Sequence, residues 1–182
     1  MDFKMVLGLL LNDFQKENIR YGLIGGFALG LYGIHRSTVD LDFLVLFEDI
    51  PKIEKIMEKY GYECAFKSEN VSQYISPLKP FGLIDYLHAF KKTAVGMLKR
   101  AKEIEIFEKE LKIKVIIPED IIGLKIQAAA NDKNREESEY IDIKEILGYY
   151  RKNLNWGLIE EYFLIFEQKE KFEGLKRRFY VD

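Results

Sequence analysis

The sequence YGLIGGFALGLYGIHRSTVDLDFLVL, from Tyr21 to Leu46, decides the fold of this chain. It predicts a short strand over 21–24, a glycine turn, a short helix over 27–32, and a second strand that contains Asp40 and Asp42. Side chains alternate between the two faces of a strand, so both aspartates project from one face. Neighbouring carboxylates repel each other, and the usual positive partner of such a pair is a divalent cation such as Mg²⁺.

A glycine turn precedes the predicted helix. Gly25 and Gly26 follow the first strand directly. Glycines at this point let the backbone approach a ligand closely, and the start of the helix directs free N–H groups at an anion. Arg36 and Thr38 lie just before the acidic strand, where a guanidinium and a hydroxyl are placed to hold further phosphate oxygens. We therefore expect a phosphate chain on the glycine turn, bridged by a metal to the two aspartates.

These motifs resemble the signature of the nucleotidyltransferase superfamily, which has the DNA polymerase beta-like catalytic fold. Gly25 and Gly26 are followed by thirteen residues and then by Asp40, Leu41 and Asp42. The sequence GGFALGLYGIHRSTVDLDFLV is most similar to small bacterial and archaeal members that include abortive-infection type toxins. The spacing G-x-G-x-x-G of dinucleotide-binding proteins and the Gly-Lys-Ser/Thr of a Walker loop do not occur in the chain.

The resemblance implies an enzyme with a Mg²⁺ or Mn²⁺ cofactor. Such enzymes transfer a nucleoside monophosphate from a nucleoside triphosphate to an acceptor hydroxyl and release pyrophosphate. Their catalytic and metal-binding residues are here Asp40, Asp42 and a third acid on a neighbouring strand. Asp85, in the apolar segment 81–90, is the candidate for that acid, and its assignment depends on a strand register that the sequence does not determine. The alternative is a lone aspartate facing solvent on an edge strand.

Lys125 is the candidate for a further phosphate contact. It belongs to a helix that begins at Pro118, and its four neighbours at i±3 and i±4 are apolar, so it lies on the buried side of that helix. It either extends to water or reaches toward phosphate, and the resemblance favours phosphate. Apolar neighbours also predict that Lys125→Met leaves stability unchanged or improved. Glu139 and Asp142 either brace this helix, as an acid pair does in the resembled proteins, or lie on an exposed helix.

Length and composition indicate one compact α/β (α+β) protein. With 182 residues, 48% of them hydrophobic, the chain is long enough for one well-packed core. We expect a small mixed β-sheet with flanking helices in residues 1–117, the nucleotidyltransferase-like catalytic core. Residues 118–182 are expected to form a helical part packed on it. Within this plan, 62–79 are a strand with a loop, Ile104 to Ile117 a hairpin, and 131–139 a loop.

Charge and cysteine content restrict the partners. The net charge of −2 gives no global attraction to nucleic acid or membranes, so an RNA substrate needs a local patch. The single cysteine, Cys64, excludes a disulfide framework and a cysteine zinc cluster, and indicates a reducing cytoplasm. We expect neither a signal peptide nor a membrane span, because charged residues interrupt the apolar N-terminal segment.

Other functions remain open at this point. The chain is alternatively a catalytically silent member of the same fold that binds nucleotide or a partner protein. A third possibility is an RNA-binding or antitoxin-like module that acts through the basic C-terminal end, Lys169 to Arg178. The acceptor of a transferase is equally open, and an RNA end, a protein side chain and a small molecule are all compatible with these motifs.

Overall fold

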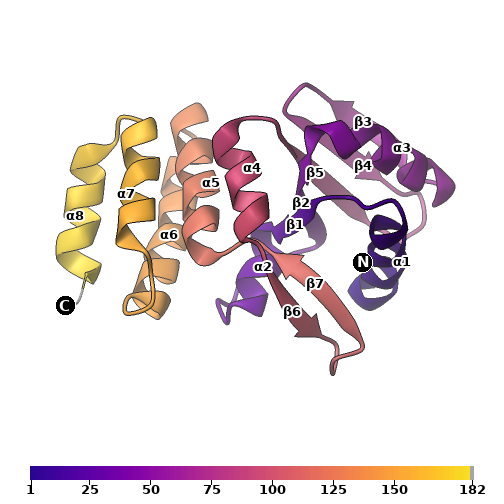
Figure 1. Cartoon of the computed structure of the whole chain (residues 1–182), viewed down its shortest axis with the longest axis horizontal. Coiled ribbons are helices and arrows are strands. Elements are labelled where there is room, and N and C mark those ends of the chain that lie inside the picture. The colour runs from indigo at the N-terminus through magenta and orange to yellow at the C-terminus, as the bar shows by residue number, and fades with distance from the viewer. Residues whose placement is uncertain (181–182) are drawn as a thin grey trace. The chain divides into compact units, whose positions relative to one another are not determined.

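The computed structural model describes residues 1–180, which form eight α-helices and a seven-stranded sheet (Figure 1). The predicted α/β class is confirmed. The chain divides into two compact units, Met1–Ile116 and Ile117–Asp182. The sequence placed this division after residue 117. The first unit contains the whole sheet, and the second is helical.

The sheet is mixed, and its central strands carry the acidic motif. Its strand order is β3-β4-β5-β2-β1-β7-β6. Strands β2 and β5 are parallel, as are β1 and β7, and all other neighbours are antiparallel. The strands are β1 (Tyr21–Ile24), β2 (Asp40–Leu46), β3 (Glu63–Lys67), β4 (Val71–Ile75), β5 (Leu83–Ala89), β6 (Lys102–Ile106) and β7 (Leu111–Val115).

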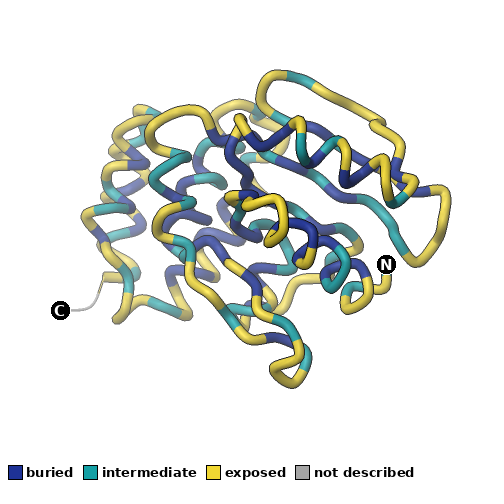
Figure 2. Tube along the Cα trace, turned by 45° about the vertical axis from the view of Figure 1, so that its right-hand side comes forward, coloured by how far each residue is buried: buried dark blue, intermediate teal, exposed yellow. Residues whose placement is uncertain are grey.

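An aromatic core covers the sheet face opposite the aspartates. Phe43 of β2 and Tyr86 of β5 stack with ring centroids 5.7 Å apart, and Phe14 packs edge-on against both rings. Phe14 comes from α1, and the Tyr86 hydroxyl contacts the sulfur of Met57 on α3. The buried strands and helix faces are dark blue in Figure 2. The helices of this unit are α1 (Phe3–Lys16), α2 (Gly25–Leu31), the 3₁₀ helix η1 (Phe47–Asp49), α3 (Ile50–Lys59) and α4 (Lys92–Arg100).

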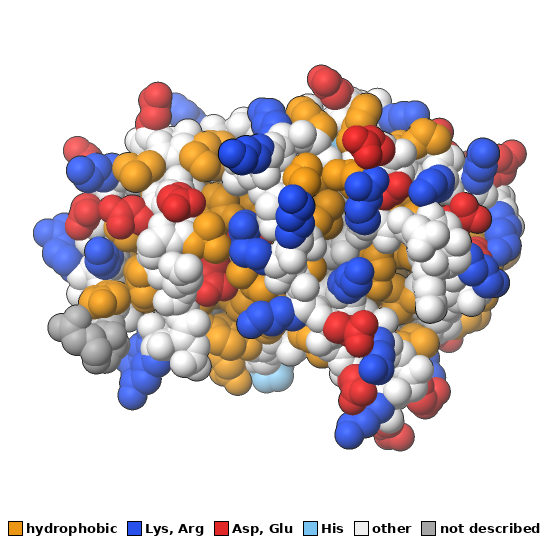
Figure 3. Space-filling model, viewed as in Figure 1, with side chains coloured by type: hydrophobic (Ala, Val, Ile, Leu, Met, Phe, Trp, Pro, Cys, Tyr) orange, Lys and Arg blue, Asp and Glu red, His pale blue; other side chains and the backbone are white. Residues whose placement is uncertain are grey.

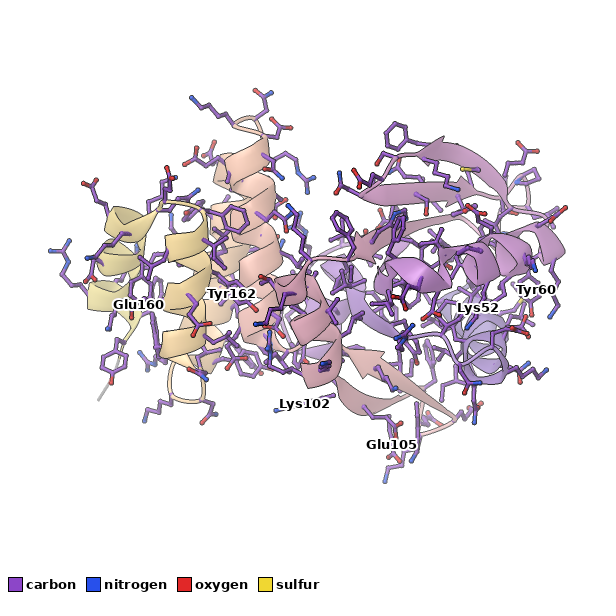
Figure 4. All side chains as sticks on the ribbon, turned by 45° about the horizontal axis from the view of Figure 1, so that its top comes forward. Lys52, Tyr60, Lys102, Glu105, Glu160 and Tyr162 are labelled. Carbon is purple, nitrogen blue, oxygen red and sulfur yellow. The ribbon has the colours of Figure 1, made fainter. Side chains whose placement is uncertain are left out.

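The second unit is built on a helix pair that packs closely. The Tyr162 hydroxyl of α7 donates to Asp120 Oδ1 of α5 at 2.5 Å, and Figure 4 labels Tyr162. A Cβ at Gly123 of α5 would lie 2.8 Å from the Tyr162 ring, so glycine permits this approach. No helix in residues 1–180 has the length and apolar character needed to span a membrane. The helices of this unit are α5 (Pro118–Asn131), α6 (Glu136–Tyr150), α7 (Trp156–Ile165) and α8 (Lys169–Phe179).

Several predicted boundaries were wrong. Residues 62–79 form a hairpin of two strands, because the Ser68 hydroxyl accepts from the N–H groups of Asn70 and Val71 and closes the turn. The predicted loop at 131–139 is shorter, because α6 begins at Glu136, where acidic side chains suit the start of a helix. Helix α4 was not predicted, and the C-terminal residues form two separate helices, α7 and α8.

The predicted hairpin around residues 108–110 is confirmed as β6–β7. Its exposed charges are paired across the strands: Lys112 Nζ lies 3.5 Å from Glu103 Oε1 and 4.0 Å from Glu105 Oε1. Figure 3 shows acidic and basic side chains together on this hairpin, at the lower right of the view. Charged side chains protect the edge strand β6 from pairing with another chain.

An ion pair between the buried Asp13 and the exposed Lys59 joins α1 to α3. The Asp13 carboxylate is 4% exposed and accepts hydrogen bonds from Lys59 Nζ at 2.5 Å and from the Tyr60 hydroxyl at 2.8 Å. The hydrogen bond from Lys59 holds the pKa of Asp13 below its ordinary value, although burial acts in the opposite direction. The ionised carboxylate is therefore favoured in the folded protein.

We expect Asp13→Asn to destabilise the protein at neutral pH by about 1 kcal/mol, because the charge-assisted hydrogen bonds are weakened. The folded-state pKa is lowered, so this stabilisation is present above the ordinary value of about pH 4 and disappears as the pH falls through the folded value. Urea unfolding of the parent and variant as a function of pH measures it. A difference that persists unchanged in acid would contradict the assignment, and the exposed Glu58→Gln is the control.

Candidate active site

Four neighbouring strands place the acidic motif in one row. Asp42 of β2 lies opposite Asp85 of β5, Gln73 of β4 lies opposite Asp85, and Ile24 of β1 lies opposite Asp42. Paired residues in adjacent strands share a face, and Asp40 shares it because it lies two residues before Asp42. Strands β2 and β5 are both interior strands, so the edge-strand alternatives for these acids are excluded.

The glycine turn fits closely against Asp42. Gly25 has φ +68°, and a Cβ at this position would lie 1.9 Å from Asp42 Oδ2. Only glycine satisfies both the left-handed backbone and the close approach. At Gly26, a Cβ would lie 2.8 Å from the Cβ of Thr38. The two glycines therefore bring the first turn of α2 directly against β2 and against Thr38, which lies two residues before that strand.

Thr38 holds Asp40, a contact that the sequence did not predict. Its hydroxyl donates to Asp40 Oδ1 at 2.7 Å. Thr38 was predicted to hold phosphate, and its hydroxyl hydrogen is here directed at the acid instead. Arg36 is exposed in the same loop. A contact of Arg36 or Thr38 with a nucleotide stays a prediction.

Asp85 has one satisfied oxygen and one without a protein partner. Its Oδ2 accepts from the Gln73 side-chain amide at 3.1 Å, whereas its Oδ1 is buried and has no hydrogen-bond partner among the described residues. Burial raises the pKa of Asp85; the Gln73 hydrogen bond lowers it in part, and the charge of Asp40 raises it further. A buried acceptor without a partner is costly, which indicates a position prepared for a ligand or a proton.

The oxygen donors of these residues suit a hard divalent cation. Within residues 1–180, no three His, Cys, Asp or Glu side chains converge closely enough to bind a metal by themselves. Mg²⁺ is commonly held by one or two carboxylates together with substrate phosphates, so a complete protein cage is not required. The donors from Asp40, Asp42 and Asp85 are all oxygens, and Asp85 Oδ1 has no protein partner within residues 1–180.

Lys125 lies in the second unit, between two buried acids. Its Nζ donates to Glu139 Oε2 at 2.9 Å and to Asp142 Oδ2 at 2.5 Å, and the lysine side chain is 11% exposed. Burial alone would raise the pKa of Glu139, but the charges of Lys125 and Arg135 hold it below its ordinary value. The alternative of an exposed acid pair is wrong, because Glu139 and Asp142 are both buried. A contact of Lys125 with phosphate stays a prediction.

Comparison with solved structures identifies the fold. No family model matches this sequence, and no curated protein matches it. The solution structure of the antibiotic-resistance factor ANT(2'')-Ia is similar over 98% of both chains, with a TM-score of 0.63 and 15% sequence identity. The chain has the nucleotidyltransferase fold. The superfamily resemblance in the sequence is confirmed at the level of the fold.

Two further structures support the fold assignment. A putative nucleotidyltransferase from Thermotoga maritima has a TM-score of 0.58 and 14% identity, covering 77% of this chain and 92% of that one. The lincosamide antibiotic adenylyltransferase LnuA has a TM-score of 0.55 and 17% identity, covering 78% of this chain and 94% of that one. At such identities the similarity establishes the arrangement of the chain, and the chemistry has to be argued from its own residues.

Gln73 is the site residue that the sequence analysis missed. It lies in the segment 62–79, for which only one strand was predicted. The available signal was the alternation in VSQYI over Val71–Ile75, where Ser72 and Tyr74 are buried and Gln73 shares the other face with Val71 and Ile75. That alternation indicates a strand, but it does not identify Asp85 as the neighbour of Gln73.

Gly25→Ala is expected to destabilise the protein, by about 1–2 kcal/mol for the left-handed backbone alone and by more once Asp42 is displaced. Gly30→Ala, in the same helix, is the matched control because a Cβ at Gly30 has no atom within 4 Å. It should leave stability unchanged or raise it by up to about 1 kcal/mol. Denaturant unfolding measures both changes, and equal effects in the two variants would contradict the close fit of the glycine turn against Asp42.

Lys125→Met is expected to lower the free energy of unfolding by about 3–5 kcal/mol, because it removes the cation that the buried carboxylates of Glu139 and Asp142 share, although Glu139 keeps its contact with Arg135. This reverses the expectation from the apolar neighbours, which took no account of Glu139 and Asp142. Lys144→Met, at an exposed position of α6, is the control for loss of a lysine charge. Thermal and urea unfolding decide the matter, and a Lys125→Met protein as stable as the control would refute the ion-pair account.

Proposed function

We propose that this protein is a metal-dependent nucleotidyltransferase that transfers a nucleoside monophosphate from a nucleoside triphosphate to an acceptor hydroxyl, with release of pyrophosphate. The observation that carries the proposal is the in-register pairing of Asp42 with Asp85 beside the tight turn at Gly25. In this proposal, the two acids and the first backbone N–H groups of α2 contact the same ligand. A sheet with a purely structural role would gain no stability from paired acids.

The first turn of α2 binds the triphosphate in this proposal. The first N–H groups of a helix have no intrahelical partner, and Gly25 and Gly26 have no side chains that would cover them. Arg36, in the loop before β2, is the proposed cationic contact to phosphate oxygens, and a phosphate contact of Lys125 stays a prediction. Bound phosphate brings negative charge close to Asp40 and Asp42, so the complex requires a cation between them.

Asp40, Asp42 and Asp85 would hold Mg²⁺ or Mn²⁺. When bound, the cation would neutralise the phosphate charge and lower the pKa of the attacking hydroxyl. Alternatively, Asp85 is the proposed acceptor of the proton that leaves this hydroxyl, through its buried Oδ1, which has no protein partner within residues 1–180.

The acceptor is proposed only as a molecule with a hydroxyl group. The crystal structure of ANT(2'')-Ia contains adenylyl-2''-tobramycin, and that of LnuA contains lincomycin. These two relatives in fold make a small hydroxylated molecule a reasonable first class to test here. RNA ends and protein side chains are the other two classes.

Nucleoside triphosphate is expected to bind only in the presence of Mg²⁺ or Mn²⁺, because the acidic row otherwise repels the phosphates. Calorimetry with each of the four nucleotides, with metal and with excess chelator, measures this dependence. Asp42→Asn should abolish the metal-dependent part of the binding. Gly30→Ala should bind as the parent does, because it is remote from the close contacts of the turn.

Equal affinity in chelator, or no binding of any nucleotide, would contradict the proposed function. Metal-dependent binding without pyrophosphate release, with every acceptor class tested, would instead support the catalytically silent alternative. The nucleotide that binds best also narrows the reaction, because it identifies the group that is transferred.

A further inference from the structure

The side-chain amide of Gln73 donates a hydrogen bond to one oxygen of the Asp85 carboxylate, Oδ2. Gln73 Nε2 lies 3.1 Å from Asp85 Oδ2, and the two residues are directly opposite in the β4–β5 ladder. The other oxygen, Oδ1, is buried without a hydrogen-bond partner. Within residues 1–180, the carboxylate is therefore held through one oxygen, whereas the second oxygen is buried and has no protein partner.

The chemistry of the amide suits this role better than that of a charged donor. Lysine or arginine opposite Asp85 would neutralise the carboxylate and compete with a bound cation. A neutral amide fixes the orientation of the carboxylate and leaves its charge in place. Thr38 makes the same kind of contact with Asp40, through a neutral hydroxyl at 2.7 Å.

A merely structural role accounts poorly for this arrangement. Gln73 lies on an interior strand between β3 and β5, where apolar residues usually pack, and its strand neighbours on the same face are Val71 and Ile75. If stability alone were selected, an apolar pair at Gln73 and Asp85 would avoid the buried oxygen without a partner.

We infer that Gln73 is a positioning residue for the proposed transferase reaction: its amide orients Asp85 so that Oδ1 faces the site of the metal and the attacking hydroxyl. The inference rests on the proposed function. Gln73 itself contacts neither metal nor substrate, and it acts through Asp85. Such hydrogen-bond partners of ligating carboxylates usually change metal affinity or activity by about 10–100-fold when they are removed.

The test uses Gln73→Met, which keeps the length of the side chain and removes its donor. The full chain is titrated with Mn²⁺ in the presence of a nucleoside triphosphate analogue that cannot be cleaved between the α and β phosphates, and free Mn²⁺ is followed by electron paramagnetic resonance. We expect Mn²⁺ affinity to fall at least about tenfold. Ile75→Ala, an exposed position on the same strand and face, should retain the parent affinity.

The same substitution is then made in the Asp85→Asn background. Because Gln73 acts through Asp85, Gln73→Met should cause no further loss there. Gln73→Asn, which keeps the amide on a shorter side chain, should show an intermediate loss and serves as the milder variant if the methionine protein folds poorly.

The outcomes separate the inference from the proposed function. The role of Gln73 is overturned if Gln73→Met and Gln73→Asn both keep the parent affinity for Mn²⁺. It is also overturned if Gln73→Met loses the same affinity in the parent and in the Asp85→Asn background. Either result leaves the transferase proposal intact. Failure of the parent itself to bind Mn²⁺ with the nucleotide overturns both.

Discussion

The parallel pairing of β2 with β5, with Asp42 opposite Asp85, is the constraint on which the rest of this structure depends. Two carboxylates at adjacent positions in the middle of a sheet repel each other and lose hydration, so this pairing is unfavourable unless another part of the protein compensates. A shift of one residue would move Asp85 to the opposite face and place Tyr86 beside Asp42. The register therefore positions the acids and the aromatic core together.

The opposite face of the same two strands provides the compensation. Phe43 and Tyr86 stack there, and α1 and α3 bury them completely. Aromatic side chains contribute the largest buried areas in a core, and a slipped register would expose them. The hydrophobic face thus holds the acids in an arrangement that they would not adopt by themselves. The neutral donors Thr38 and Gln73 orient the carboxylates without removing their charge.

Local sequence patterns predicted the parts of the site that lie close together in the chain. Asp40 and Asp42 share a face because side chains in a strand have a period of two. Gly25 and Gly26 mark the point where the first strand ends and the helix begins. The register of Asp85 was not predictable, because it depends on pairing with a strand about forty residues away. Gln73 was missed because its strand is short, and because the alternation in VSQYI does not identify Asp85 as its neighbour. The apolar helix neighbours of Lys125 did not account for its ion pairs, because Glu139 and Asp142 lie on another helix.

The melting temperature of Asp85→Asn, with and without Mg²⁺ and nucleotide, tests the central claim most directly. Burial raises the pKa of Asp85, so at neutral pH the ionised carboxylate costs stability, and removing its charge should raise the melting temperature of the metal-free protein. Mg²⁺ with nucleotide should then stabilise the parent by mass action and leave the variant nearly unchanged. If Asp85→Asn melts below the parent without metal, and both proteins respond equally to Mg²⁺ and nucleotide, then the acidic row serves the fold and not the proposed chemistry.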